Sequence, residues 1–96
     1  MSKLEAMFEE HRKREFIYFE RIKVPRHPRP DLCAFLMLHE LLGGDETLIY
    51  RAENDEIFLR VDTDLLAMRA DSDFIRDLVR CGVRYNESTN TISMFV

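Results

Sequence analysis

The alternation of hydrophobic and polar positions divides the chain into helical and extended segments. Leu4, Met7 and Phe8 recur at helical spacing, and they follow a serine that forms an S-x-x-E capping box with Glu5. Two Glu-to-basic pairs spaced four residues apart come next, in the orientation that stabilises a helix. The pattern predicts a first helix from about residue 3 to at least residue 14.

Residues 16–24, FIYFERIKV, carry two conflicting signals. Their β-forming residues favour a strand, yet their aromatic spacing also continues the helical stripe. We lean slightly toward a strand. Pro25 disfavours helical geometry in the residue before it, so either element ends near Val24. Residues 25–30, PRHPRP, are expected to form an extended linker.

A second helix is expected at residues 32–42, LCAFLMLHELL, which are apolar on nearly all sides. A helix of this kind is usually buried, so this segment is the best candidate for the centre of the core. Asp31 is the expected N-cap, and Gly43 is the expected left-handed C-cap.

Two short β-type runs follow, LIYRA at 48–52 and EIFLRV at 56–61, with a turn at 53–55. Next come two predicted short helices, one capped by Asp62 or Thr63 and the other by Asp71 or Ser72. Gly82 ends the second of them. Residues 83–96 then form another hairpin.

In that last hairpin, alternate residues face opposite sides of the sheet. Ile92, Met94 and Val96 face one side. Thr91, Ser93 and Phe95 face the other.

The two predicted hairpins resemble each other at an offset of 35 residues. Tyr50 aligns with Tyr85 and Ile57 with Ile92, and the preceding helices align at an offset of 39. A structural α-β-β repeat would produce this echo, and so would the alternation of any two amphipathic hairpins.

Both explanations lead to one predicted architecture, an α+β two-layer fold. About four mainly antiparallel strands in two hairpins form the sheet, with helices on one face. We expect residues 1–96 to be a single domain. Its parts are an N-terminal segment 1–24, the linker 25–30, and two helix–hairpin units in 31–96.

Charge is unevenly distributed along the chain, whose net charge is −4. Residues 1–30 hold eight bases and five acids, and residues 31–96 hold six bases and thirteen acids. Domains that bind duplex nucleic acid are usually basic as a whole, so this layout argues against that class. With neither a secretory signal nor a long apolar segment, a cytoplasmic protein with reduced cysteines is expected.

Catalytic and metal-binding motifs are absent from the sequence. His39-Glu40 lacks the second histidine of a zinc-protease helix. Cys33, Cys81 and the other histidines, His11 and His27, do not occur at zinc-site spacing. There is also no phosphate-binding glycine loop and no G-x-S-x-G elbow. We therefore expect no enzyme, no metal and no cofactor.

Eight acidic residues form the densest charged region and are the candidate partner-binding residues: Glu53, Asp55, Glu56, Asp62, Asp64, Asp71, Asp73 and Asp77. Together they could mimic a phosphate backbone and occupy a basic groove on a target protein. Taken singly, several are explained by helix capping.

Seven basic residues in 11–30 are the alternative site, a nucleic-acid-binding arm: Arg12, Lys13, Arg14, Arg21, Lys23, Arg26 and Arg29. Exposed aromatic residues among them would stack on bases. In the other interpretation, which we prefer, Phe16, Phe19 and Ile22 join the core and the basic side chains surround them.

The preferred hypothesis is a small non-enzymatic protein-binding protein that acts as an inhibitor or adaptor. A concrete version is a phage-encoded, anti-CRISPR-type inhibitor whose acidic face acts as a DNA mimic toward a nucleic-acid-binding protein or complex. The first alternative is a nucleic-acid-binding regulatory module, and the second is an enzyme subunit completed in an oligomer. No membrane partner is expected. A homodimer through the C-terminal strand would require that strand to lie at the sheet edge.

Overall fold

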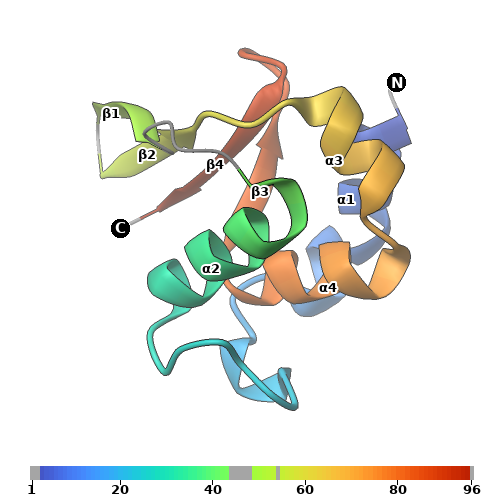
Figure 1. Ribbon diagram of the computed structural model, residues 1–96, viewed down its shortest axis with the longest axis vertical. Coiled ribbons are helices and arrows are strands. Elements are labelled where there is room, and N and C mark those ends of the chain that lie inside the picture. Colours follow the sequence, from blue (N-terminus) through green and yellow to red (C-terminus); the bar gives the residue numbers. More distant parts are fainter. Residues whose placement is uncertain (1–2, 44–48, 54, 96) are drawn as a thin grey trace.

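The computed structural model describes residues 3–43, 49–53 and 55–95, and it confirms the α+β two-layer fold (Figure 1). Residues 2, 48, 54 and 96, which belong to the predicted capping box, hairpin, turn and last strand, lie outside these ranges. The elements in chain order are α1 (Lys3–Glu15), η1 (Phe19–Arg21), α2 (Pro30–Leu42), β1 (Ile49–Glu53), β2 (Glu56–Leu59), α3 (Thr63–Arg69), α4 (Ser72–Arg80), β3 (Val83–Asn86) and β4 (Thr91–Phe95).

The sheet is antiparallel, with strand order β1-β2-β4-β3. The two predicted hairpins are therefore present, and they meet through the pairing of β2 with β4. Because β4 lies inside the sheet, the C-terminal strand does not offer the free edge that the predicted homodimer required. The outermost strands of the described sheet are β1 and β3.

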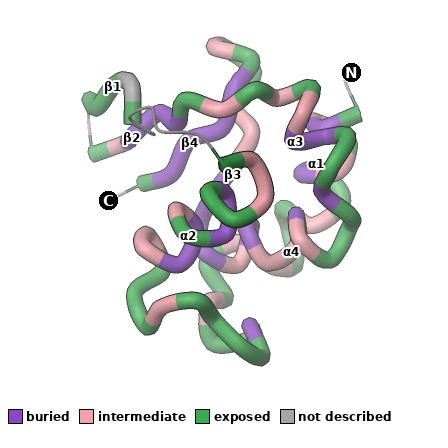
Figure 2. Tube along the Cα trace, viewed as in Figure 1, coloured by how far each residue is buried: buried purple, intermediate pink, exposed green. Residues whose placement is uncertain are grey.

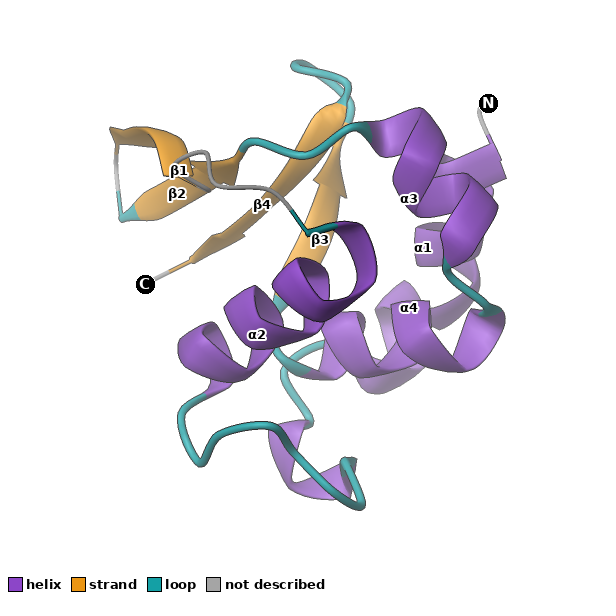
Figure 3. Cartoon of the chain, in the orientation of Figure 1, coloured by secondary structure: helices purple, strands orange, loops and turns teal. Residues whose placement is uncertain are grey.

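The two faces of the sheet differ in composition and in cover. The helices lie on one side of the sheet (Figure 3). Ile57 pairs with Met94 and Leu59 with Ile92, and all four side chains are buried in one core cluster with residues of the helices. The opposite face contains two arginine–phenylalanine stacks: the guanidinium carbon of Arg51 lies 4.5 Å from the Phe58 ring centroid, and that of Arg84 lies 4.7 Å from the Phe95 ring centroid. The predicted alternation along β4 is thus confirmed for residues 91–95.

The core lies between the helices and this apolar sheet face (Figure 2). Each helix from α1 to α4 contributes side chains to it, and α2 supplies Cys33, Ala34, Met37 and Leu38, all nearly fully buried. The prediction that residues 32–42 form a helix that contributes to the core is confirmed, but α2 is not buried on nearly all sides, because Leu36 is 40% exposed and His39 and Glu40 are exposed.

The predicted strand at residues 16–24 is wrong. Helix α1 ends at Glu15, and Ile17 then adopts a left-handed backbone with φ of 58°. Its amide donates a hydrogen bond to the Val79 carbonyl at 3.2 Å. Ile22 is buried, and Phe16 and Phe19 pack partly against the core. The segment therefore wraps over α4 and has no strand partner, as the packing interpretation expected.

The start of α2 also differs from the prediction. Pro30 occupies the first turn, Arg29 is the N-cap residue without a side-chain cap bond, and Asp31 is already helical. Proline is preorganised for the first helical position, which moves the cap two residues upstream of Asp31. Gly43 has the expected positive φ of 70°, although its ψ of −156° lies outside the left-handed helical region.

The caps of the two short helices are confirmed. The Asp62 side chain accepts hydrogen bonds from the amides of Asp64 and Leu65, both at 3.1 Å. The Asp71 side chain accepts one from the Phe74 amide at 2.8 Å. Gly82 follows α4 with a backbone φ of 95°, a conformation that residues with a Cβ atom rarely adopt.

The sequence echo holds for the inner strands and fails for the outer ones. The offset of 35 relates Ile57 to Ile92 and Leu59 to Met94. In the sheet Ile57 pairs with Met94 and Leu59 with Ile92, which is the register expected if a two-fold axis relates β2 to β4. In the outer strands, however, Ile57 faces Ala52 while Ile92 faces Tyr85. The sequence echo aligned Tyr50 with Tyr85, but the residue that occupies the position equivalent to Tyr85 in the sheet is Ala52, two residues further along the chain.

Candidate binding groove

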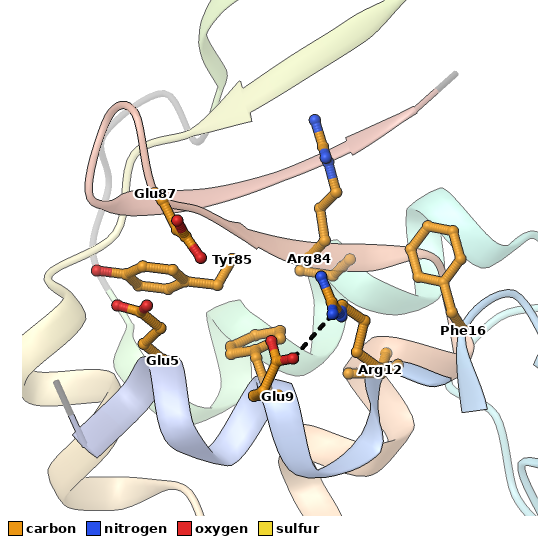
Figure 4. Close-up of a pocket in the computed structure, with 10 residues that line it drawn as sticks. Glu5, Glu9, Arg12, Phe16, Arg84, Tyr85 and Glu87 are labelled. Carbon is orange, nitrogen blue, oxygen red and sulfur yellow. Dashed lines mark ion pairs between the residues drawn. The ribbon is translucent and has the colours of Figure 1, made fainter. Parts of the chain in front are cut away.

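A small pocket lies between α1 and β3 (Figure 4). The rings of Phe8 and Tyr85 meet there with centroids 6.4 Å apart. On α1, Arg12 forms an ion pair with Glu9 at 2.8 Å. The pocket volume is about 30 Å³, which is close to the space of one water molecule. Despite its charged rim, the pocket is too small for a ligand.

A larger open groove has a volume of about 570 Å³, within the range of small-molecule and side-chain pockets. Four segments that are distant in sequence form it: the turn after α1, the start of α2, the α4–β3 junction and the end of β4. We call it the Ile17 groove, and its lining residues are Phe16, Ile17, Phe19, Arg29, Pro30, Asp31, Arg80, Cys81, Gly82, Met94 and Phe95.

Two large apolar side chains of this groove are exposed: Ile17 is 67% and Phe95 is 52% exposed. Ile17 is also a β-branched residue whose backbone is in the left-handed region, and this conformation costs about 1–2 kcal/mol of conformational free energy. Its γ-methyl lies 3.5 Å from where a Cβ on residue 82 would be, which is ordinary van der Waals contact, so Ile17 packs beside Gly82. The structure thus maintains an unfavourable backbone while presenting an apolar side chain to solvent.

An ion-pair network fixes the chain on both sides of Ile17. Glu15 and Arg80 pair at 2.7 Å, with side chains 15% and 13% exposed. Arg80 also pairs with Asp77 at 3.2 Å and donates to the Arg21 carbonyl at 3.1 Å. The hydrogen bond from Arg80 holds the pKa of Glu15 below its usual value. This network joins the ends of α1 and α4 at the groove.

The chain that walls the groove is basic, because residues 11–30 hold seven Lys and Arg against two Glu. Arg29 at the rim pairs with Asp31 at 3.0 Å. Lys13, Arg14 and Lys23 have no acidic side-chain partner within residues 3–43, 49–53 and 55–95. The charged residues that line the groove itself, Arg29, Asp31 and Arg80, all form ion pairs.

The predicted basic site is partly neutralised elsewhere. Arg26 forms an ion pair with Glu40 at 2.9 Å. The guanidinium carbon of Arg21 lies 4.2 Å from the Tyr18 ring centroid, and a guanidinium nitrogen of Arg21 lies 3.6 Å from a carboxylate oxygen of Glu15. Tyr18 is exposed, and Arg21 covers one face of its ring. The seven predicted basic residues thus do not act as one free patch.

The eight predicted acidic residues lie in two separate groups. Glu53, Asp55 and Glu56 belong to the β1–β2 hairpin, and the other five belong to α3 and α4 or cap them. In Figure 1 the hairpin lies at the left and these helices at the right. The acids therefore do not form one continuous cluster.

Most of these acids have internal partners. Asp62 and Asp71 are the helix caps described above. Four more form ion pairs, which are Glu53–Arg51 at 3.0 Å, Glu56–Arg84 at 2.7 Å, Asp73–Arg76 at 3.2 Å and Asp77–Arg80 at 3.2 Å. Asp55 and Asp64 are exposed and have no side-chain partner in the described part of the chain.

Glu56 is the most tightly held of the eight. Ser93 donates to its carboxylate at 2.6 Å, and Arg84 donates at 2.7 Å. Burial raises the pKa of Glu56, but the hydrogen bonds from Ser93 and Arg84 outweigh this effect, and the pKa is lowered overall. A carboxylate held in this way organises the sheet surface and has few lone pairs left for a partner.

The described residues contain no cluster of three or more His, Cys, Asp or Glu suited to a metal ion. Cys33 and Cys81 are free and buried. Burial and the neighbouring Cys33 raise the pKa of the Cys81 thiol, so it is a poor nucleophile. Over the same described ranges, no helix is long and apolar enough to cross a membrane.

No protein-family model, curated protein or solved structure matches this chain.

The sequence did not predict the groove, although the position of one groove residue is unusual in the sequence pattern. Phe95 falls on the polar side of the alternation in β4, with Thr91 and Ser93, where an apolar side chain is out of place. Ile17 gave no such signal, because its conformation depends on contacts with Val79 and Gly82, far along the chain.

Proposed function

We propose that the protein is a non-enzymatic protein-binding protein, an inhibitor or adaptor, and that it holds its partner in the Ile17 groove. The observation that carries this proposal is the exposed, left-handed Ile17 beside a groove of about 570 Å³. Strained residues of this kind persist where function needs them. Large apolar side chains that fill such hollows are the anchors of protein interfaces.

The partner's charge is inferred from the segment that carries Ile17, residues 11–30, which is basic in composition. Lys13, Arg14 and Lys23 lack acidic partners among the residues described, so a binding segment with acidic residues would complement them. The occupant we propose is a segment of another protein that places one apolar side chain between Ile17 and Phe95, with acidic residues on either side.

This proposal differs from the phosphate-mimic version in the surface used. Six of the eight candidate acids cap helices or form ion pairs, and the eight lie in two groups. Partnered carboxylates offer less to a basic groove than free ones do, so the Ile17 groove has more support as the contact surface.

Site-specific photo-crosslinking in the native host tests the proposal. A benzophenone amino acid at Phe95 should capture one dominant protein, and the crosslink should map to an apolar residue within an acidic stretch. The matched control carries the same group at Met68, which is 72% exposed on α3. Capture at position 95 should fall when Ile17→Asn is added. Equal capture at both positions, or no effect of Ile17→Asn, would contradict the proposal.

Nucleic-acid binding is the second candidate. Lys13, Arg14 and Lys23, which have no acidic side-chain partner among the described residues, favour it, as does the exposed Tyr18 of the same segment. Affinity for a single-stranded oligonucleotide, measured by fluorescence anisotropy, should then fall steeply between about 50 and 200 mM salt. Replacing the three cations by alanine should flatten that dependence. Absent or salt-independent binding would remove this candidate.

A further inference from the structure

The two edges of the sheet differ in their protection. At the β3 edge, α1 lies alongside Tyr85 (Figure 4), and the ring of Phe8 on α1 meets the Tyr85 ring. Strand β1 pairs with β2 on one side and has no strand on its other side in the described part of the chain. Ile49, Arg51, Ala52 and Glu53 are all exposed. An open edge of this kind presents backbone N–H and C=O groups to another strand.

The charges on β1 select a particular partner strand. Arg51 and Glu53 are two residues apart, so they lie on the same face of the sheet, where they form an ion pair at 3.0 Å. If two copies of β1 pair antiparallel about Ala52, each Arg51 faces Glu53 of the other copy. Opposite charges facing each other across strands stabilise a pairing, and like charges destabilise it.

Other registers of the same strand lack this match. A two-fold axis at Arg51 would place the two Arg51 side chains directly opposite each other, and an axis at Glu53 would do the same for the glutamates. The register shift between Ile49 and Arg51 interrupts regular pairing at the start of β1. The self-complementary stretch is therefore short and centred on Ala52.

We propose that two copies of this chain associate by antiparallel pairing of β1 about a two-fold axis at Ala52, which joins their four-stranded sheets edge to edge. The association is weak and concentration-dependent, because the paired stretch is short. The β1 edge is separate from the Ile17 groove, whose strand residues come from β4, so this inference does not depend on the proposed function.

Sedimentation velocity over a wide concentration range tests the dimer through charge reversal. The native chain should shift from monomer to dimer as its concentration rises. Arg51→Glu and Glu53→Arg should each weaken association at least about tenfold, because each places like charges opposite one another twice. Asp73→Arg on α4 is the control and should leave association unchanged.

Mixing the two variants gives the sharpest result. In a pair of Arg51→Glu with Glu53→Arg, both cross-strand contacts again join opposite charges, so the mixture should dimerise although neither variant does alone. The double variant Arg51→Glu/Glu53→Arg should dimerise like the native chain, and this also controls for loss of the Arg51–Phe58 stack. A native chain that stays monomeric, or variants that dimerise separately but gain nothing on mixing, would overturn the proposal.

Discussion

Ile17 combines an unfavourable backbone with an apolar side chain that is 67% exposed. Folding gains little from burying such a side chain, and the left-handed conformation costs free energy. The hydrogen bond from its amide to the Val79 carbonyl holds it there. A residue that is costly for the free protein is well explained if the bound state uses it.

Replacing Ile17 by asparagine should separate stability from binding. Asparagine tolerates the left-handed region, so Ile17→Asn should raise the free energy of unfolding by up to about 1 kcal/mol in urea denaturation. Partner capture should fall in the same variant. Val24→Asn, at an exposed position whose φ is not positive, should bring no gain. A clear loss of stability in Ile17→Asn would show that this side chain serves packing.

At the scale of elements, the Glu15–Arg80 pair joins the end of α1 to the end of α4. Glu15→Gln should lower the free energy of unfolding at pH 7 by about 1–3 kcal/mol, since a charged hydrogen bond between largely buried groups is lost. Glu9→Gln breaks the exposed pair with Arg12 and should cost less than about 0.5 kcal/mol.

The pH dependence of this effect follows from the sign of the pKa shift. The pKa of Glu15 is lower in the folded protein than its ordinary value of 4.5, so its stabilisation is fully present above that pH. It is lost as the pH falls through the folded pKa. The difference between the native chain and Glu15→Gln should therefore shrink in acid, and a difference that persists there would contradict this assignment.

Elements with local signals were predictable from the sequence, and elements fixed by distant contacts were not. The caps at Asp62 and Asp71 are set by neighbours a few residues away, and the sequence predicted both. Residues 16–24 have the composition of a strand, but in the structure they pair with neither β1 nor β3. Their fold is set by α4, through Val79 and Arg80, which no local pattern shows.

For the whole molecule, composition did not predict which carboxylates are free. Residues 31–96 are strongly acidic in composition, yet arginines from the same region neutralise Glu53, Glu56, Asp73 and Asp77. Pairing of this kind depends on which elements meet in space, so composition alone could not predict it.

Isothermal titration of the partner captured at position 95 tests the central claim most directly. Phe95→Ala removes a groove side chain and should weaken binding at least about tenfold. Asp71→Asn keeps a good helix cap while it removes a charge, and it should change the affinity by less than about twofold. An unchanged affinity for Phe95→Ala, with a large loss for Asp71→Asn, would contradict the groove and return the contact to the acidic surface.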